Sequence, residues 1–125
     1  MSITVSTIRN DLNSNLLCVA TTSGAIPITQ GLVLLNDSSS GLEMTLAAPV
    51  PGDQLSGGQD GEELSIIVVA SAPLTSPITH TVTCPSNAIE GVFSTLTFIG
   101  QSGEIAHLVA FAGAWWPRSI TAAKS

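Results

Sequence analysis

Residues 64–70 read LSIIVVA, a continuous apolar stretch rich in β-branched side chains. An uninterrupted run of this length and composition is typical of a β-strand that is covered on both of its faces. A long polar loop precedes it and closes with the turn signal Asp60-Gly61. We therefore predict a strand over residues 64–70 at the centre of a sheet.

The stretches on either side of this run alternate apolar and polar residues, which is the period-two pattern of a half-buried strand. Residues 42–46, LEMTL, are an example. Polar segments such as NDSSSG (36–41) and GQSG (100–103) separate the runs as turns, the latter at hairpin spacing. The other predicted strands cover residues 3–8, 16–20, 32–35, 79–83, 93–99 and 105–111, with a short last strand around Trp115.

Helix signals are almost absent from the sequence. The one candidate covers residues 7–17, where Ile8, Leu12 and Leu16 recur every four residues, but Asn and Ser between them form helices poorly. Short strands separated by Gly- and Pro-containing turns are typical of sandwiches and jelly rolls. The sequence therefore predicts an all-β fold, an antiparallel β-sandwich or jelly roll of about eight short strands with an N-terminal arm.

The first 30 residues differ in composition from the rest of the chain, because they are rich in Asn, Ser and Thr and alternate weakly. A chain of 125 residues can bury one core but not two. We predict an N-terminal arm or added strand over residues 1–30, a sandwich body over 31–118 and a C-terminal tail over 119–125.

Charged residues make up only 10% of the chain, compared with roughly a quarter in average domains. A mean hydropathy of +0.45 excludes a disordered chain. The three bases, Arg9, Arg118 and Lys124, are too few to neutralise nucleic-acid phosphates. No apolar run is long enough to span a membrane, and the N-terminus lacks the pattern of a secretory signal. We expect neither a nucleic-acid nor a membrane partner.

The scarcity of charge also bears on self-association. Ser, Thr and Ala cost much less to dehydrate than ionised side chains do. A surface built from them is easily buried against another subunit. We therefore expect an oligomer of this chain.

Metal ligands are sparse in the sequence. His80 and Cys84 could supply two zinc ligands, but a zinc site needs more, and neither these residues nor His107 has an obvious acidic partner. Cys18 and Cys84 form no CxxC pair, so we interpret them as small apolar core residues. The acids of the 49–63 segment match no calcium motif and are interpreted as a solvated loop: Asp53, Asp60, Glu62 and Glu63. We expect no metal and no cofactor.

Catalytic signatures are also missing. The segment GQSG (100–103) is not the GxSxG elbow of serine hydrolases, and it lies between predicted strands rather than at a strand-to-helix turn. No pair of carboxylates is flanked by aromatic residues in the manner of a glycosidase site. We expect that the protein is not an enzyme.

Trp115 and Trp116 are the most conspicuous aromatic residues. Neighbours on a strand point to opposite faces, so one ring should enter the core and the other should face outward. The alternative is that both rings pack beneath a loop of the same subunit. An outward tryptophan would serve as a contact for a partner or as a platform for a sugar.

Three segments in succession resemble the small β-domains of tailed-phage virion proteins. They are DGEELSIIVVAS (60–71), THTVT (79–83) and STLTFIGQSGEIAHLVAFAGAWWP (94–117). Their order matches a DG-x-x-L-x-I strand, an HTVT strand, a T-x-T-F strand, an L-x-A strand and a terminal Gly-x-Trp, over most of residues 31–118. The chain departs from this pattern by its second tryptophan, followed by Pro117, and by the long loop 49–61.

The resemblance implies a structural virion protein that assembles as a homotrimer. A fibre needs a shaft and an attachment domain, and the sequence has neither, which favours a capsid decoration (cement) protein. We expect it to be made in the host bacterial cytoplasm and to bind the major capsid protein on the outside of the icosahedral virion, its three arms acting together. The alternative is a receptor- or carbohydrate-binding knob of a head or tail fibre. Candidate contacts are Ile3, Val5, Ile8 and Arg9 for the shell, and Phe111, Trp115 and Trp116 for other subunits or outer partners.

Overall fold

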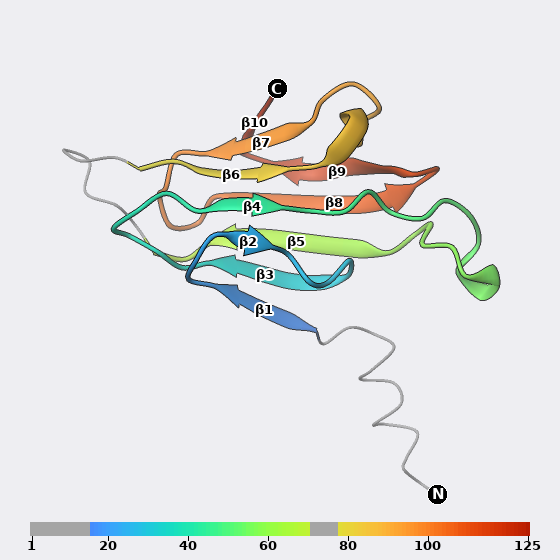
Figure 1. Cartoon of the computed structure of the whole chain (residues 1–125), viewed down its shortest axis with the longest axis horizontal. Coiled ribbons are helices and arrows are strands. Elements are labelled where there is room, and N and C mark those ends of the chain that lie inside the picture. Colours follow the sequence, from blue (N-terminus) through green and yellow to red (C-terminus); the bar gives the residue numbers. More distant parts are fainter. Residues whose placement is uncertain (1–15, 71–77) are drawn as a thin grey trace, which may run out of the picture.

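The computed structural model of the chain describes residues 16–70 and 78–125, which form two five-stranded sheets packed face to face (Figure 1). In sheet order, the first contains β1 (Leu17–Ala20), β3 (Gly31–Leu35), β5 (Glu63–Val68), β8 (Ile105–Phe111) and β9 (Ala114–Ile120). The second contains β10 (Ala123–Lys124), β7 (Thr95–Phe98), β6 (His80–Thr83), β4 (Glu43–Thr45) and β2 (Gly24–Ala25). Short 3-10 turns, η1 (Gln54–Ser56) and η2 (Pro85–Asn87), lie between strands. The predicted all-β sandwich is confirmed. We call the two layers the β5 sheet and the β6 sheet.

The sheets are mixed rather than purely antiparallel. In the β5 sheet, β1, β3 and β5 run parallel to one another, and β8 and β9 continue the sheet in antiparallel fashion. In the β6 sheet, β2, β4 and β6 run parallel to one another, and β7 and β10 continue it in antiparallel fashion. The reason is that the chain changes sheet at every step from β1 to β6, so that successive strands of one sheet run in the same direction. The turn at 100–103 likewise crosses from β7 to β8 in the other sheet and does not close a hairpin.

The strand predicted at residues 64–70 is the middle strand of its sheet, flanked by β3 and β8. Its inward side chains, Leu64, Ile66 and Val68, are fully buried. Ser65 and Ile67 alternate with them and stay partly exposed on the other side of the sheet. Within residues 16–70 and 78–125, this strand is therefore covered on one face and not on both.

The described strands extend beyond the predicted sandwich body. β1 and β2 belong to the two sheets, so the added-strand interpretation applies to residues 17–25. The predicted tail 119–125 is not free, because Ala123–Lys124 pairs with β7 and the Ser125 carbonyl accepts hydrogen bonds from Ser94 and Thr95. β2 and β10 were not predicted. The predicted strand at 3–8 and most of the alternative helix at 7–17 lie outside the described residues.

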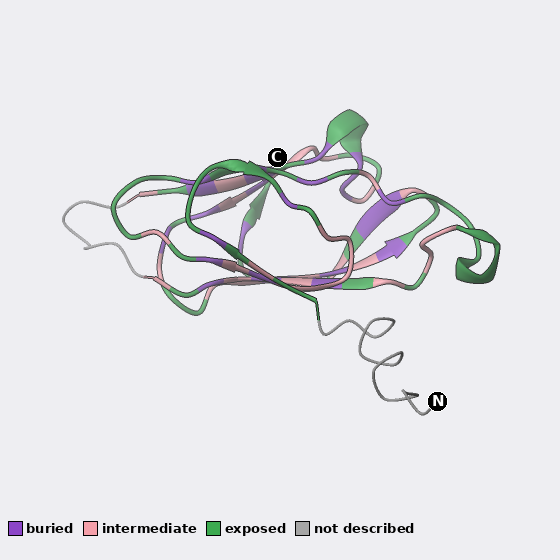
Figure 2. Cartoon of the chain, turned by 60° about the horizontal axis from the view of Figure 1, so that its bottom comes forward, coloured by how far each residue is buried: buried purple, intermediate pink, exposed green. Residues whose placement is uncertain are grey.

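One core fills the space between the sheets, and Figure 2 shows buried residues, in purple, recurring along the strands. Trp115 and Phe98 are the largest of its fully buried side chains. Cys84 is also in the core and Cys18 packs against it, and both are free thiols. The predicted role as a small apolar core residue agrees with the placement of Cys84, whereas Cys18 is only partly buried.

Candidate functional site

A loop over residues 49–61 projects from one end of the sandwich and carries an apolar side chain at its tip. η1 lies at this tip, at the far right of Figure 1. Leu55, in the middle of η1, is 96% exposed. An isolated leucine on a surface is ordinary, so the conformation of the loop decides whether Leu55 matters.

Hydrogen bonds within the loop fix the conformation of its tip. The Asp53 carboxylate accepts the Leu55 N–H at 3.1 Å, and the Asp53 carbonyl accepts the Gly58 N–H at 2.9 Å. The Gln54 side chain donates to the Asp60 carbonyl at 2.7 Å. Gly58 lies so close to Gly52 that a Cβ atom on it would be 2.1 Å from the Gly52 oxygen. Leu55 is therefore presented by a preorganised tip.

Further bonds join the base of the loop to the sandwich. The Asp60 carboxylate accepts the Ala112 N–H at 2.9 Å, in the turn between β8 and β9, and the Gly61 N–H donates to the Ala110 carbonyl at 2.7 Å. Gln59 donates to Thr29 and to Glu62, at 2.7 and 3.1 Å. The segment interpreted from sequence as a solvated acidic loop is thus an ordered structure whose acids accept internal hydrogen bonds.

The outer face of the β5 sheet is mostly apolar. The strand registers place Val19, Leu34, Ile67 and Ile105 side by side in one row across four strands. Leu17 and Leu32 form the start of the next row. None of these side chains belongs to the core between the sheets.

A small polar cluster interrupts this apolar face. The Glu63 carboxylate accepts from His107 Nε2 at 2.8 Å and from the Arg118 guanidinium at 3.1 Å. All three side chains are partly exposed. Exposed ion pairs contribute little to stability. Here the pair means that the charges of Glu63 and Arg118 compensate each other on the same face.

The outer face of the β6 sheet has a different chemistry. Thr81 and Thr83 on β6 lie beside Thr97 and Thr95 on β7, and Thr45 on β4 lies beside Thr83. Glu43 is the acid of this face, next to Thr81. The two sheets therefore turn an apolar face and a threonine-rich face to the outside.

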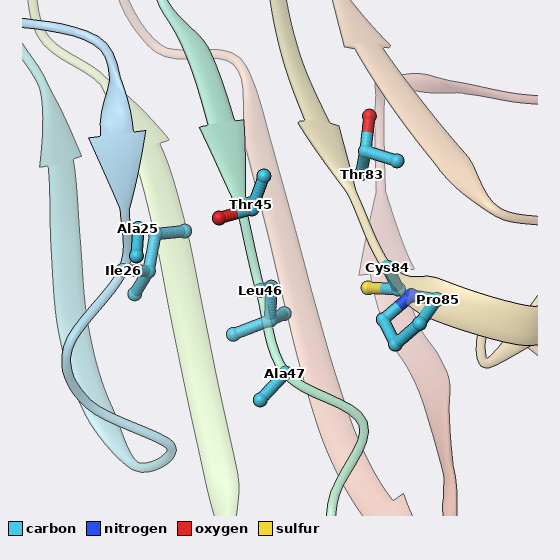
Figure 3. Close-up of a pocket in the computed structure, with 8 residues that line it drawn as sticks. All are labelled: Ala25, Ile26, Thr45, Leu46, Ala47, Thr83, Cys84 and Pro85. Carbon is cyan, nitrogen blue, oxygen red and sulfur yellow. The ribbon is translucent and has the colours of Figure 1, made fainter.

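A shallow pocket of about 410 Å³ opens where β2, β4 and β6 end (Figure 3). Burial raises the pKa of the Cys84 thiol to about 11, so this group stays protonated at neutral pH. Apart from Cys84, Thr45 and Thr83, the lining is aliphatic. It comprises Ala25, Ile26, Thr45, Leu46, Ala47, Thr83, Cys84 and Pro85. The pocket can hold an apolar group, but it contains no acid–base pair.

His80 is fully buried at the start of β6. Its Nδ1 accepts the Leu42 N–H at 2.9 Å, so the proton of the neutral ring is on Nε2, which has no hydrogen-bond partner among the described residues. Among residues 16–70 and 78–125, no three His, Cys, Asp or Glu side chains converge as metal ligands. His80 and Cys84 are at opposite ends of β6.

The structure separates the residues singled out from the sequence. Trp115 is fully buried and donates from Nε1 to the Ala47 carbonyl at 3.0 Å, so it cannot itself touch a partner, which corrects its inclusion among the contacts. Trp116 and Phe111 are 41% and 59% exposed, as expected of an outward ring and a strand end. The arm residues Ile3, Val5, Ile8 and Arg9 lie outside the described residues.

Neither the exposed Leu55 nor the apolar rows on the outer face of the β5 sheet were predicted from the sequence. The Gly-rich composition of 49–61 marked a loop, but not one that fixes an apolar tip. Helices long and apolar enough to cross a membrane are absent from the described part of the chain. No protein-family model, curated protein or solved structure matches this sequence.

We predict that acidification destabilises the fold through His80. Desolvation lowers the pKa of this buried ring, with weaker opposing effects from Asp37 and Glu104. The unfolded chain then binds a proton more readily, so stability is complete above the ordinary histidine pKa of about 6.5 and decreases as the pH falls through it. Tm, measured by circular dichroism, should therefore drop between about pH 7.5 and about pH 5.5.

The variant His107→Gln is the control, because it removes the exposed histidine and keeps His80. It should show the same decrease in Tm. A Tm that is constant over this range, or a decrease that disappears in His107→Gln, would contradict the assignment to His80. Hydrogen bonds from Ser39 and Ser40 lower the pKa of Asp37 to about 2, so protonation of this carboxylate affects stability only in more acidic solution.

Proposed function

We propose that this chain is a structural virion protein, a capsid decoration protein that binds the outside of an icosahedral shell as a homotrimer. The observation that carries the proposal is the preorganised loop with Leu55 exposed at its tip. An ordered loop that holds an apolar side chain in water gains by inserting it into a protein socket.

Preorganisation favours binding by this loop. Ordering a flexible loop costs free energy at the moment of association, and a loop already fixed by internal hydrogen bonds avoids most of that cost. Compact loops whose ends lie close together are frequently functional. Here the ends meet through the Gln59 N–H, which donates to the Val50 carbonyl at 2.7 Å. Leu55 is therefore proposed as the anchor that enters the shell protein.

The charge of the loop indicates what surrounds the socket. Asp53, Asp60 and Glu62 lie along the loop and its base, and the described segment from 49 to 63 holds no lysine or arginine. Complementary potentials across an interface guide association and select the partner. We therefore propose a socket in the major capsid protein with basic residues at its rim.

The N-terminal arm would add to this contact. Ile3, Val5 and Ile8 are apolar, and Arg9 is one of the three bases of the chain. Several modest contacts on one trimer act at high effective concentration, so each can be weak while attachment is durable. The arm and the loop are thus proposed as two contacts with the same shell.

A second candidate function is a carbohydrate-binding knob, which Trp116 favours. Its ring is 41% exposed and is oriented by a hydrogen bond from Nε1 to the Phe111 carbonyl at 2.9 Å. A fixed, exposed indole is a suitable platform for a sugar ring. Binding of glycans by the full chain, with no affinity for shells, would support this function in place of decoration.

Co-sedimentation with purified shells tests the proposal. The shells should be assembled from the major capsid protein encoded in the same genome. The full chain should pellet with them, and Leu55→Asp should bind at least about tenfold more weakly, because burying a leucine contributes about 1.5–3 kcal/mol per subunit. Val92→Asp is the matched control, since Val92 is 64% exposed outside the loop.

The outcomes separate the parts of the proposal. Absence of binding by the full chain would contradict the decoration function. If the Leu55→Asp and Val92→Asp variants bind shells equally strongly, the loop is not the contact with the shell. Binding lost in Leu55→Asp and retained in Val92→Asp is the expected result.

A further inference from the structure

We infer that the outer face of the β5 sheet is the surface through which copies of this chain contact one another. The inference rests on the proposed function in one respect, namely that copies of the chain assemble. It assigns that assembly to a particular surface. The proposed occupant of this face is a second copy of the chain.

The composition of β3 and β5 is typical of strands whose two faces are both buried. The two strands run parallel and read GLVLL and ELSIIV. Parallel strands with near-continuous apolar sequences are characteristically buried on both faces. Here Val33 and Ile66 face the core and are fully buried, whereas Leu34 and Ile67 face outward and remain partly exposed. The described residues provide a cover for only one side of these strands.

Apolar side chains reach every strand of the sheet, while the row that begins with Leu17 and Leu32 continues through the polar residues Ser65, His107 and Ser119. The row Val19–Leu34–Ile67–Ile105 crosses four strands, and Val109 lies beside Trp116 on the fifth. With strands about 4.8 Å apart and about 3.3 Å per residue, the whole outer face, polar residues included, measures about 400 Å² when taken as flat. The largest apolar patch on a soluble monomer typically measures about 300–600 Å² and is often functional. At its edge Leu17 is 59% exposed and at its end Phe111 is 59% exposed.

The charges on this face favour a second copy over a charged partner. The acid Glu63 is paired with Arg118 on the same face, and His107 shares that carboxylate. The face therefore carries no net charge of its own when His107 is neutral, and nothing on it attracts a strongly acidic or basic partner. Another copy can pack its own apolar side chains against these rows without bringing an unpaired charge into the contact.

The other outer face supplies the contrast. It carries Thr45, Thr81, Thr83, Thr95 and Thr97 where the β5 sheet carries aliphatic side chains. Hydroxyl groups need hydrogen-bond partners when they are buried, whereas aliphatic groups gain free energy by leaving water. Association should therefore use the β5 sheet rather than the β6 sheet.

Sedimentation velocity of the purified full chain tests the inference without any shell. At micromolar concentration the chain should sediment as an oligomer. Ile67→Lys places a charge in the middle of the face and should raise the dissociation constant at least about a hundredfold, giving monomers. Thr81→Lys is the matched control, because Thr81 is also partly exposed and is on the strand that occupies the middle of the other sheet. It should remain oligomeric.

A second variant covers the case in which Ile67→Lys fails to fold. Leu17 is more than half exposed on an edge strand, so Leu17→Lys should keep a native circular dichroism spectrum and still weaken association. A monomeric full chain would overturn the inference, as would oligomers that persist in both Ile67→Lys and Leu17→Lys. Shell binding is measured separately. An oligomer that does not bind shells would therefore contradict the proposed function and still support this inference.

Discussion

Trp115→Ala is expected to lower the free energy of unfolding by about 3–5 kcal/mol, the usual cost of removing a buried aromatic side chain. Trp115 is fully buried in the core and bridges the two sheets, since Nε1 donates to the Ala47 carbonyl beyond β4. The alanine leaves a cavity and also leaves that carbonyl without its donor, which adds to the loss. Small domains have only about 5–15 kcal/mol of stability, so the variant should be close to unfolding.

Trp116→Ala is the natural control, because the same residue type is removed one position along β9. Its ring is 41% exposed and contacts solvent on the outer face of the sheet. Urea denaturation of both variants at one protein concentration should show a large decrease in the midpoint for Trp115→Ala and a small one for Trp116→Ala. Similar losses in the two variants would contradict the placement of the rings on opposite faces.

Gly58→Ala is expected to disrupt the 49–61 loop and to reduce shell binding as strongly as Leu55→Asp does. The added Cβ would lie 2.1 Å from the oxygen and 2.3 Å from the carbonyl carbon of Gly52. Both contacts are with backbone atoms, so the two sides of the loop must move apart. This movement would break the bond from the Gly58 N–H to the Asp53 carbonyl and disorder the tip that carries Leu55.

Hydrogen exchange of the loop amides measures this effect directly. Protection of the Gly58 and Asp60 N–H groups should be lost in Gly58→Ala, while the amides of the core strands stay protected. Ser56→Ala is the control, because Ser56 is exposed on the same 3-10 turn. Unchanged protection in Gly58→Ala, or equal loss in Ser56→Ala, would show that the loop does not depend on the close approach of Gly58 to Gly52.

Much of the fold could be predicted because period-two alternation fixes which side chains face the core. Residues 42–46 illustrate this, since Met44 is buried while Glu43 and Thr45 are exposed. Adjacent tryptophans could be assigned to opposite faces by the same rule. The alternation is equally compatible with parallel and antiparallel neighbours, however. The change of sheet at each step from β1 to β6 therefore could not be predicted from it.

The two surfaces that we propose for binding were harder to predict for a physical reason. The exposure of Leu55 depends on hydrogen bonds and on a glycine–glycine contact within a loop, which no periodic pattern encodes. The apolar face depends on register, because Val19, Leu34 and Ile67 become neighbours only through strand pairing. Scarcity of charge predicted self-association without indicating a surface. The surface that we propose for it could be named only from the pairing of the strands.

Electron microscopy of shells incubated with the full chain shows whether this protein decorates a capsid. The shells should again consist of the major capsid protein encoded in the same genome. We expect regularly spaced additional density on the outer surface, built from several copies of the chain and lost when the Leu55→Asp variant replaces it. Shells without added density, imaged at concentrations where the chain itself is folded and oligomeric, would contradict the proposal that this protein decorates a capsid.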